Sequence, residues 1–293
     1  MRATWVFLLV TSGLLAADSL QAQDDVPKSS AEQRLIFART AARDYRFELP
    51  GRRDQPQVTL QPEPLLRWNN QVIREDDGML FLWTAGPKGR PVAAAQFFVV
   101  KSDWHHEFQS LSPHGFDARC AGAGSENWSW QPTRPGCDLA HADGIDSIAD
   151  SAAGRLRQMK SIAERFSAAV DPNGKFDSPE QLRLLTTPVY RYTAPEQGIT
   201  DGALFAFVQG TNPEILVIVE AGGSEADGQS WRYGFARMSC FFLRVYRGDT
   251  IVWKADREPV PTSDRAHTYC FRLNTQVDAS AEVQVPAATP KSN

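Results

Sequence analysis

Two stretches of the chain carry apolar residues at the spacing of an amphipathic helix. The first helix is predicted over residues 31–46 and the second over 151–169. In each, the apolar positions follow one another by three or four residues: Leu35, Ala38, Ala42 and Tyr45 in the first, and Leu156, Met159, Ala163 and Phe166 in the second. A serine precedes each stretch, where its hydroxyl can accept a hydrogen bond from the free amides of the first turn.

Apolar and aromatic runs, separated by Gly, Pro, Asn and Asp, predict β-strands after each helix. Asp77-Gly78 and Asp201-Gly202 stand ahead of two of these runs, and we expect both to be turns because glycine tolerates a positive φ. The predicted strands lie near 57–68, 79–85, 91–101, 104–111, 180–192, 202–209, 214–221, 230–247, 250–254 and 267–273.

Part of this pattern occurs twice. Residues 58–86 and 182–210 align without a gap. The identities are Pro64, Arg67, Asp77, Gly78, Leu80, Phe81 and Gly86 against Pro188, Arg191, Asp201, Gly202, Leu204, Phe205 and Gly210. Such self-similarity indicates a duplicated structural unit, although two β-rich stretches can also match by chance.

The predicted fold class is α+β, with two tandem units that each consist of one helix followed by a four-stranded antiparallel sheet. We favour an arrangement in which the two sheets join into one continuous sheet; the alternative is two units that face each other. The units span residues 23–112 and 151–276. Residues 113–150, which lack sustained periodicity, are predicted to form a connecting loop.

The two ends of the chain differ from the rest. Residues 1–22 look like a signal peptide, with a basic start, a short apolar run and small residues before a cleavage site after Ala22. We therefore expect an exported protein, periplasmic or extracellular, without a membrane span once the signal peptide is removed. Residues 277–293 are rich in Ala, Pro, Thr and Ser and lack aromatic residues, which predicts a disordered tail.

The net charge and the missing motifs argue against several classes of function. The net charge of −4 leaves no basic surface of the kind that binds nucleic acid. The chain lacks a dinucleotide fingerprint, a phosphate loop, a His-Glu-x-x-His zinc motif and a Gly-x-Ser-x-Gly elbow. No cofactor is predicted, and the sequence favours a protein that is not an enzyme.

Four cysteines suit the oxidising compartment that export implies. Their order along the chain suggests two local disulfides, Cys120–Cys137 and Cys240–Cys270, although four cysteines allow three pairings. The alternative is four buried free thiols.

Asn127-Trp128-Ser129-Trp130 is the candidate binding segment. Two tryptophans in a polar loop rich in glycine and proline are harder to bury than tryptophans on strands. Exposed Trp128 and Trp130 rings could stack on a sugar or anchor a protein, so a protein or glycan partner in the cell envelope is predicted. The alternative is a loop that folds back and buries both rings.

A second candidate site is a metal centre. On a strand, His105 and Glu107 share one face. They could hold a metal if a third ligand came from the 113–150 segment, with His114 or His141 as candidates. The alternative is an ordinary polar strand face.

Three segments resemble a family of uncharacterised exported bacterial proteins: WHHEFQSLSP (104–113), RLRQM (155–159) and DGALFAFVQGTNPEILVIVEA (201–221). The resemblance implies export and an α+β fold, and brings no assigned activity. The leading hypothesis is a non-enzymatic binding or scaffold protein of the periplasm or exterior. The alternative is a metal-assisted hydrolase that acts on envelope or polysaccharide material.

Overall fold

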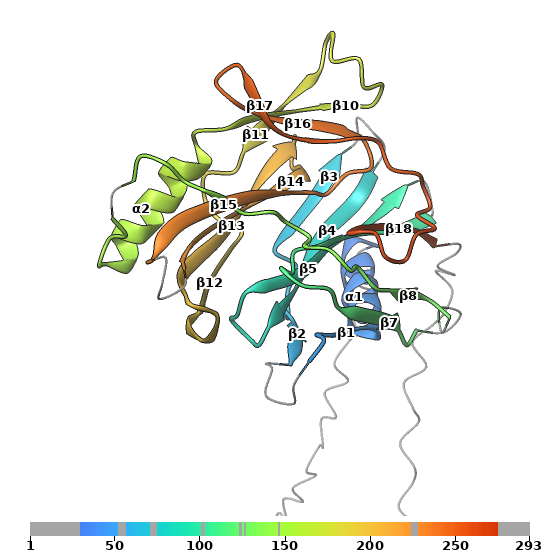
Figure 1. Cartoon of the computed structure of the whole chain (residues 1–293). Coiled ribbons are helices and arrows are strands. Elements are labelled where there is room, and N and C mark those ends of the chain that lie inside the picture. The colour runs from blue at the N-terminus through green and yellow to red at the C-terminus, as the bar shows by residue number, and fades with distance from the viewer. Residues whose placement is uncertain are drawn as a thin grey trace, which may run out of the picture.

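The computed structural model describes residues 30–51, 57–70, 75–100, 103–122, 125, 127–145, 147–223 and 228–274. Within them the chain forms two α-helices, one short 3-10 helix and 18 β-strands (Figure 1). The predicted signal peptide and the predicted disordered tail lie outside the described residues.

The elements follow one another in two series. The first is α1 (Ser30–Asp44), β1 (Tyr45–Glu48), β2 (Val58–Leu60), β3 (Leu66–Asn70), β4 (Glu75–Ala85), β5 (Pro91–Val100), β6 (Asp103–Ser110), β7 (Asp117–Cys120), β8 (Ser129–Trp130) and β9 (Ala140–His141). The second is α2 (Ala152–Ala163), β10 (Ser167–Asp171), β11 (Glu180–Leu184), β12 (Tyr190–Ala194), η1 (Pro195–Gln197), β13 (Ile199–Gln209), β14 (Asn212–Gly222), β15 (Ser230–Arg237), β16 (Phe242–Arg247), β17 (Thr250–Ala255) and β18 (Tyr269–Asn274).

The prediction of an α+β fold with two helix-plus-four-strand units is wrong. The structure is mostly β, with 49% of it in strands that pair into three antiparallel sheets, one a half-barrel. One sheet has the order β17-β16-β10-β11-β13-β14-β15-β9, with β12 also on β13; the second has the order β18-β6-β5-β4-β2, with β3 also on β4; the third is β1-β7-β8. Strands β7, β8 and β9 lie in the segment predicted to be a loop, and at two to four residues they are too short to show a hydrophobic period.

The chain divides into two halves and two connecting straps. The first half is residues 30–130 and the second half is residues 152–255. The first strap, residues 131–139, leads from the first half to β9, and the second strap, residues 256–268, leads from the second half to β18.

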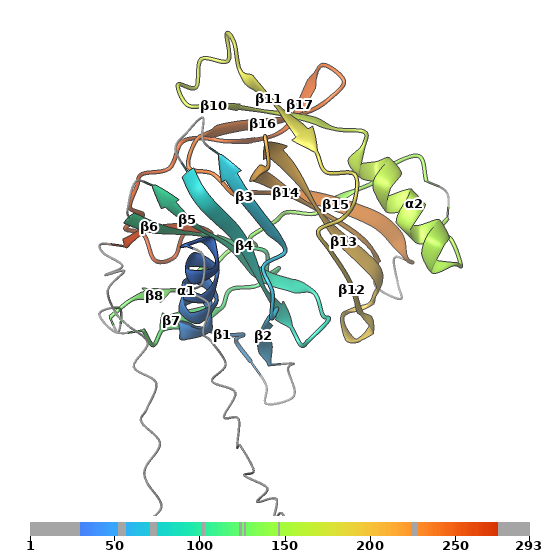
Figure 2. The same cartoon turned by 180° about the vertical axis from the view of Figure 1, so that it is seen from behind.

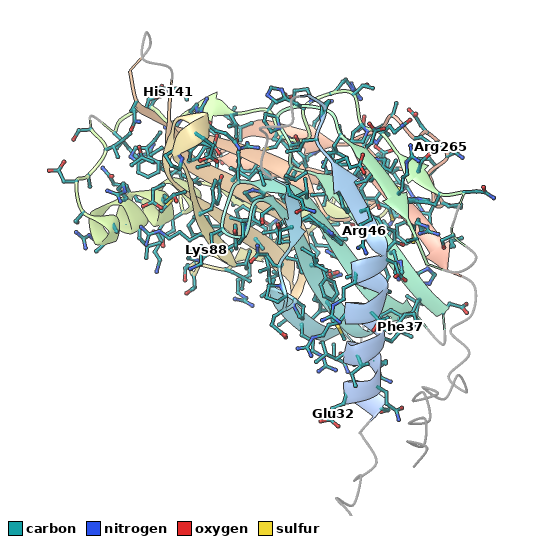
Figure 3. The ribbon with its side chains drawn as sticks, turned by 90° about the horizontal axis from the view of Figure 1, so that it is seen from below. Glu32, Phe37, Arg46, Lys88, His141 and Arg265 are labelled. Carbon is teal, nitrogen blue, oxygen red and sulfur yellow. The ribbon has the colours of Figure 1, made fainter. Side chains whose placement is uncertain are left out.

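Each half is completed by a strand that follows the other half in the sequence. Strand β9 pairs with β15 of the second half, and β18 pairs with β6 of the first half. Figure 3 accordingly places His141 of β9 on the side of α2, and Arg265 of the second strap on the side of α1. The two straps therefore cross from one half to the other, and each ends in a strand of the half that it reaches.

The helices α1 and α2 lie on opposite sides of the molecule, with the long strands between them (Figures 1 and 2). Successive residues of these strands point to opposite faces. In β4, Phe81 belongs to the core beneath α1, whereas Leu80 and Leu82 belong to a core shared with Leu204 and Leu216 of the second half. Strands β4, β5, β13 and β14 are therefore buried on both faces, which explains their long apolar runs.

An aspartate held by two arginines fastens α2 to its sheet. Asp201 of β13 accepts hydrogen bonds from Arg155 Nε of α2 (2.8 Å) and from Arg191 Nε and Nη2 of β12 (2.9 and 2.6 Å). Arg191 Nη2 also donates to the carbonyl of Ala152 in the first turn of α2, at 2.6 Å. The helix start, two strands and one carboxylate thus form a single hydrogen-bonded unit.

The first half contains the same arrangement. Asp77 of β4 accepts from Arg34 Nε of α1 (3.0 Å) and Arg67 Nη2 of β3 (2.6 Å), and Arg67 donates to the carbonyl of Ala31 (2.7 Å). Burial alone would raise the pKa of Asp77 and of Asp201. The hydrogen bonds and charges of the arginines outweigh burial and hold both pKa values below their ordinary range.

The prediction that Asp77-Gly78 and Asp201-Gly202 are turns is wrong, because both pairs lie inside long strands. Glycine is needed there for another reason. A Cβ on Gly202 would lie 2.4 Å from Cζ of Tyr192, the residue opposite it on β12. The tyrosine ring thus covers bare backbone, which only glycine provides.

Two polar contacts join the halves through their shared core. Arg90 Nε of the first half donates to Glu220 Oε2 of the second at 3.1 Å, and both side chains are almost fully buried. Gln96 of β5 donates to the main-chain carbonyls of Pro213 and Met238. Because these groups are withdrawn from water, their pairing specifies how the two halves sit on each other.

Candidate binding cleft

A polar cleft of about 560 Å³ opens where the two straps meet. Its lining comes from β6 (Gln109), the first strap (134–138), β15 (235–237), β17 (253–255) and the second strap (Asp256, Glu258, His267 and Thr268). Since these segments belong to both halves, the cleft exists only in the assembled fold. Junctions of this kind are common places for ligand sites.

Hydrogen bonds hold the straps against each other and against the first half. The N–H of Gln131 donates to the carbonyl of Arg265 at 2.7 Å, and that of Gly136 donates to the carbonyl of Ser112 at 2.9 Å. The indole Nε1 of Trp130 donates to the carbonyl of His267 at 2.7 Å. The walls of the cleft are therefore set by the fold and not by a ligand.

Arg237, Glu258 and His267 form a fixed part of the lining. Arg237 Nη1 donates to Glu258 Oε1 at 2.9 Å, and all three guanidinium nitrogens donate to nearby main-chain carbonyls. Glu258 Oε1 lies 3.4 Å from His267 Nε2, while His267 Nδ1 accepts the N–H of Tyr269 at 3.1 Å. With both ring nitrogens engaged, His267 is not placed to activate a water or hydroxyl in the cleft.

Gln109 is the lining residue with an unused polar atom. Its side chain is buried, and Nε2 donates to the carbonyls of Ser110 (2.8 Å) and Gly136 (3.1 Å), which fixes the orientation of the amide. Within the described part of the chain, no donor reaches the buried Oε1. A buried acceptor without a partner costs on the order of 1–3 kcal/mol, so a ligand that donates to Oε1 removes that cost.

Four exposed side chains of the cleft carry charge. Arg134 and Lys254 are cationic, and Asp138 and Asp256 are anionic. We call these four residues the rim charges. Their signs balance, so the rim favours neither an anion nor a cation.

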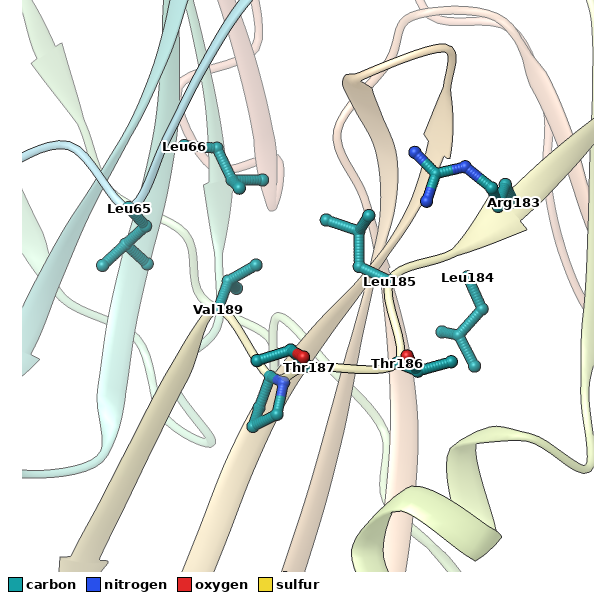
Figure 4. A pocket seen from close by; sticks show the side chains of 9 residues that line it. Leu65, Leu66, Arg183, Leu184, Leu185, Thr186, Thr187 and Val189 are labelled. Carbon is teal, nitrogen blue, oxygen red and sulfur yellow. The ribbon is translucent and has the colours of Figure 1, made fainter.

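A second cavity, of about 460 Å³, lies at another contact between the halves (Figure 4). Leu65, Leu66, Leu185 and Val189 point toward it, and these side chains also border the core that the halves share. Arg183 lies beside it and donates to the carbonyl of Gly210 at 3.0 Å. This groove is the open end of the shared core. Thr186 and Thr187 also line it, and within the described residues no polar side-chain atom of its lining is both buried and without a partner.

The structure separates the two tryptophans of the predicted binding segment. Trp130 is fully buried in the core of the first half. Trp128 is half-buried: its ring meets that of Tyr45 edge-on at 5.1 Å, and the guanidinium of Arg272 lies 5.0 Å from its centre. Only Trp128 is therefore accessible to a partner at this loop, whereas Trp130 positions the second strap.

The residues of the predicted metal centre do not gather. His105 and Glu107 share a strand face as predicted, but His105 lies between the rings of Phe98 and Phe271, and Glu107 is buried and accepts the hydroxyl of Tyr269. His114 is exposed. Burial lowers the pKa of His105 below its ordinary value. In the residues that the structure describes, no group of three His, Cys, Asp or Glu side chains is placed to hold a metal.

The predicted disulfides, Cys120–Cys137 and Cys240–Cys270, are not formed: all four cysteines, each of them described, are free. Cys120 and Cys270 lie in the core of the first half, and Cys137 lies in the shared core, so the first predicted pair is divided between two cores. Burial raises the pKa of Cys137 to about 12 and that of Cys270 to about 11. These thiols are correspondingly poor nucleophiles at neutral pH.

This placement predicts how the cysteines react. In purified protein without reductant, we expect denaturant to expose four thiols to iodoacetamide, and native protein to react at least about a hundredfold more slowly. Mass spectrometry of the alkylated chain counts the thiols. Recovery of unalkylated protein until a reductant is added would instead show the two disulfides that the cysteine order suggests.

No helix within the described ranges is both long and apolar enough to cross a membrane. Comparison with protein-family models, with curated proteins and with solved structures finds no match to the chain. The resemblance suggested by the three sequence segments therefore has no support from these comparisons.

Sequence reasoning did not find the cleft. Gln109, Glu258 and His267 carry no motif and come from distant parts of the chain. No feature of the sequence pointed to Gln109, which is one of several polar residues in β6 (DWHHEFQS). Its importance depends on Gly136, which only the fold brings beside it.

Proposed function

We propose that the chain is a binding protein and not an enzyme, and that it works after export, in the periplasm or outside the cell. Its site is the cleft between the straps. The observation that supports this most is Gln109 Oε1, a buried acceptor without a donor among the described residues, beside a cavity of about 560 Å³. Arg237 and Glu258 of the same lining are already held by protein partners, so this part of the site is organised before a ligand arrives.

The alternative of a metal-assisted hydrolase has no comparable support. It requires His105, Glu107 and a third ligand at one place. Glu107 is instead bound by Tyr269, and His105 is packed between aromatic rings. We therefore do not propose it.

Capture from the host tests the proposal. Tagged protein is cross-linked in its own envelope fraction and culture fluid, and retained proteins and glycans are identified. We expect wild type to retain a partner that an Arg134→Glu/Lys254→Glu variant loses, because both residues line the cleft and are exposed, so their replacement leaves the core intact.

The matched control is Trp128→Ala, which removes an aromatic side chain outside the cleft. We expect it to retain the partner. A partner lost in Trp128→Ala and kept in the cleft variant would place binding at the aromatic loop and overturn the proposed site. No partner with any protein would overturn the binding function itself.

A further inference from the structure

We infer that the ligand of the cleft is a neutral carbohydrate, such as a short oligosaccharide or the end of a glycan chain. This inference rests on the proposed binding function and adds the chemical class of the ligand. It derives from the charge of the lining, the unused acceptor and an aromatic side chain at the edge of the cleft.

The charges of the lining favour neither sign of ion. The rim charges balance, and Arg237 pairs with Glu258 at 2.9 Å. An anion would meet two rim carboxylates beside the two rim cations, and a cation would meet the same mixture. A neutral molecule with many hydroxyls can donate to the carboxylates and accept from the cations at once.

The unused acceptor favours a ligand that carries a hydrogen-bond donor. Gln109 Oε1 is buried, and the amide is held by its two Nε2 hydrogen bonds. A hydroxyl group supplies a donor without bringing charge into the cleft, whereas a carboxylate or phosphate offers only acceptors at neutral pH. Sugar hydroxyls meet this requirement.

Trp253 supplies the apolar component. It lines the cleft, is half-buried, and its ring packs against Phe235 with centroids 6.1 Å apart. A ring held in this way can stack on the C–H face of a sugar, since aromatic side chains combine a large apolar surface with a defined orientation. Polar side chains around one supported tryptophan match the two faces of a pyranose.

Titration of the purified protein with neutral oligosaccharides tests the inference, with calorimetry and tryptophan fluorescence as readouts. The panel contains glucan, mannan, galactan and N-acetylglucosamine fragments. We expect at least one to bind, with an affinity that changes less than about twofold between about 50 mM and 500 mM NaCl, because a neutral ligand is not screened. Failure of every fragment to bind would overturn the inference, and so would an affinity that collapses in high salt, because binding would then rest on the rim charges.

Variants locate the bound sugar. Trp253→Ala should weaken binding about tenfold, and Trp253→Phe should retain most of it because a ring remains. Gln109→Leu should also weaken binding about tenfold, and Trp128→Ala should leave it unchanged. Circular dichroism checks that each variant folds. If Gln109→Leu does not fold, the comparison of Trp253→Ala with Trp253→Phe still tests whether the sugar lies in the cleft. Equal affinity for wild type and Trp253→Ala would overturn the assignment.

The experiments distinguish failure of the carbohydrate inference from failure of the proposed binding function. If no oligosaccharide binds but the cleft variant still loses a captured protein, the carbohydrate inference is wrong and the binding function stands. If no oligosaccharide binds and nothing is captured, both are wrong.

Discussion

Replacing Glu220 with leucine lowers the free energy of unfolding by about 3–5 kcal/mol. The carboxylate is buried and pairs with Arg90, whose side chain is only 4% exposed. Tyr192 donates a further hydrogen bond to Glu220 at 2.8 Å. Removing the carboxylate leaves the guanidinium of Arg90 without its charged partner in the core between the halves, where water cannot solvate it. Chemical denaturation of wild type and variant at neutral pH measures the loss.

The double variant Arg90→Leu/Glu220→Leu is the control. It removes both charges, so we expect it to be more stable than Glu220→Leu alone, because the larger cost comes from the unpaired ion and not from the missing pair. A single variant within about 1 kcal/mol of wild type, or a double variant less stable than the single one, would contradict this account of the contact between the halves.

Replacing Asp201 with asparagine lowers stability by about 2 kcal/mol at pH 7, the scale of hydrogen bonds to a charged group. The arginines hold the pKa of Asp201 below its unfolded value of 3.8. The carboxylate therefore contributes fully above about pH 4, and its contribution is lost as the pH falls through the folded pKa. We expect urea unfolding curves of wild type and Asp201→Asn to differ at pH 7 and to converge as the pH falls through the folded pKa.

Asp77→Asn is the matched variant in the first half. Its two arginine side chains are each 35% exposed, against 16% and 33% for those around Asp201. Water screens the charges around Asp77 more strongly. We therefore expect Asp77→Asn to lower the free energy of unfolding by less than Asp201→Asn does, with the same direction of pH dependence. A difference between Asp201→Asn and wild type that stays constant from pH 7 to acid would show that the carboxylate charge is not the cause.

Much of the local structure follows from the sequence. The spacing of Leu156, Met159 and Ala163 predicts a helix, and the structure has α2 over Ala152–Ala163, capped by the Ser151 hydroxyl, which accepts the N–H of Gly154. The apolar runs within 79–85, 91–101, 202–209 and 214–221 predict strands, and β4, β5, β13 and β14 cover them. These elements bury enough apolar side chains for their pattern to be visible locally.

The candidate site could not be predicted in this way. Gln109 looks like one polar residue in a strand, and Trp253 looks like one aromatic residue in a hairpin. Trp128 and Trp130 have nearly the same sequence context, yet one is half-buried and the other lies fully in the core. Burial at such positions depends on which distant segment covers them, and no local pattern records that.

By itself, the sequence determined the helices and the long central strands, since hydrophobic periodicity is a property of neighbouring residues. Only the tertiary structure decided which strands pair. It paired each half with a strand that follows the other half in the sequence, β9 with the second half and β18 with the first. It also placed Asp77-Gly78 and Asp201-Gly202 inside long strands, where the two aspartates bind arginines of the helices α1 and α2. Strand pairing rests on backbone hydrogen bonds, which every residue can accept and every residue except proline can donate. The choice among partners is therefore made by the packing of the whole chain and cannot be read from any one segment.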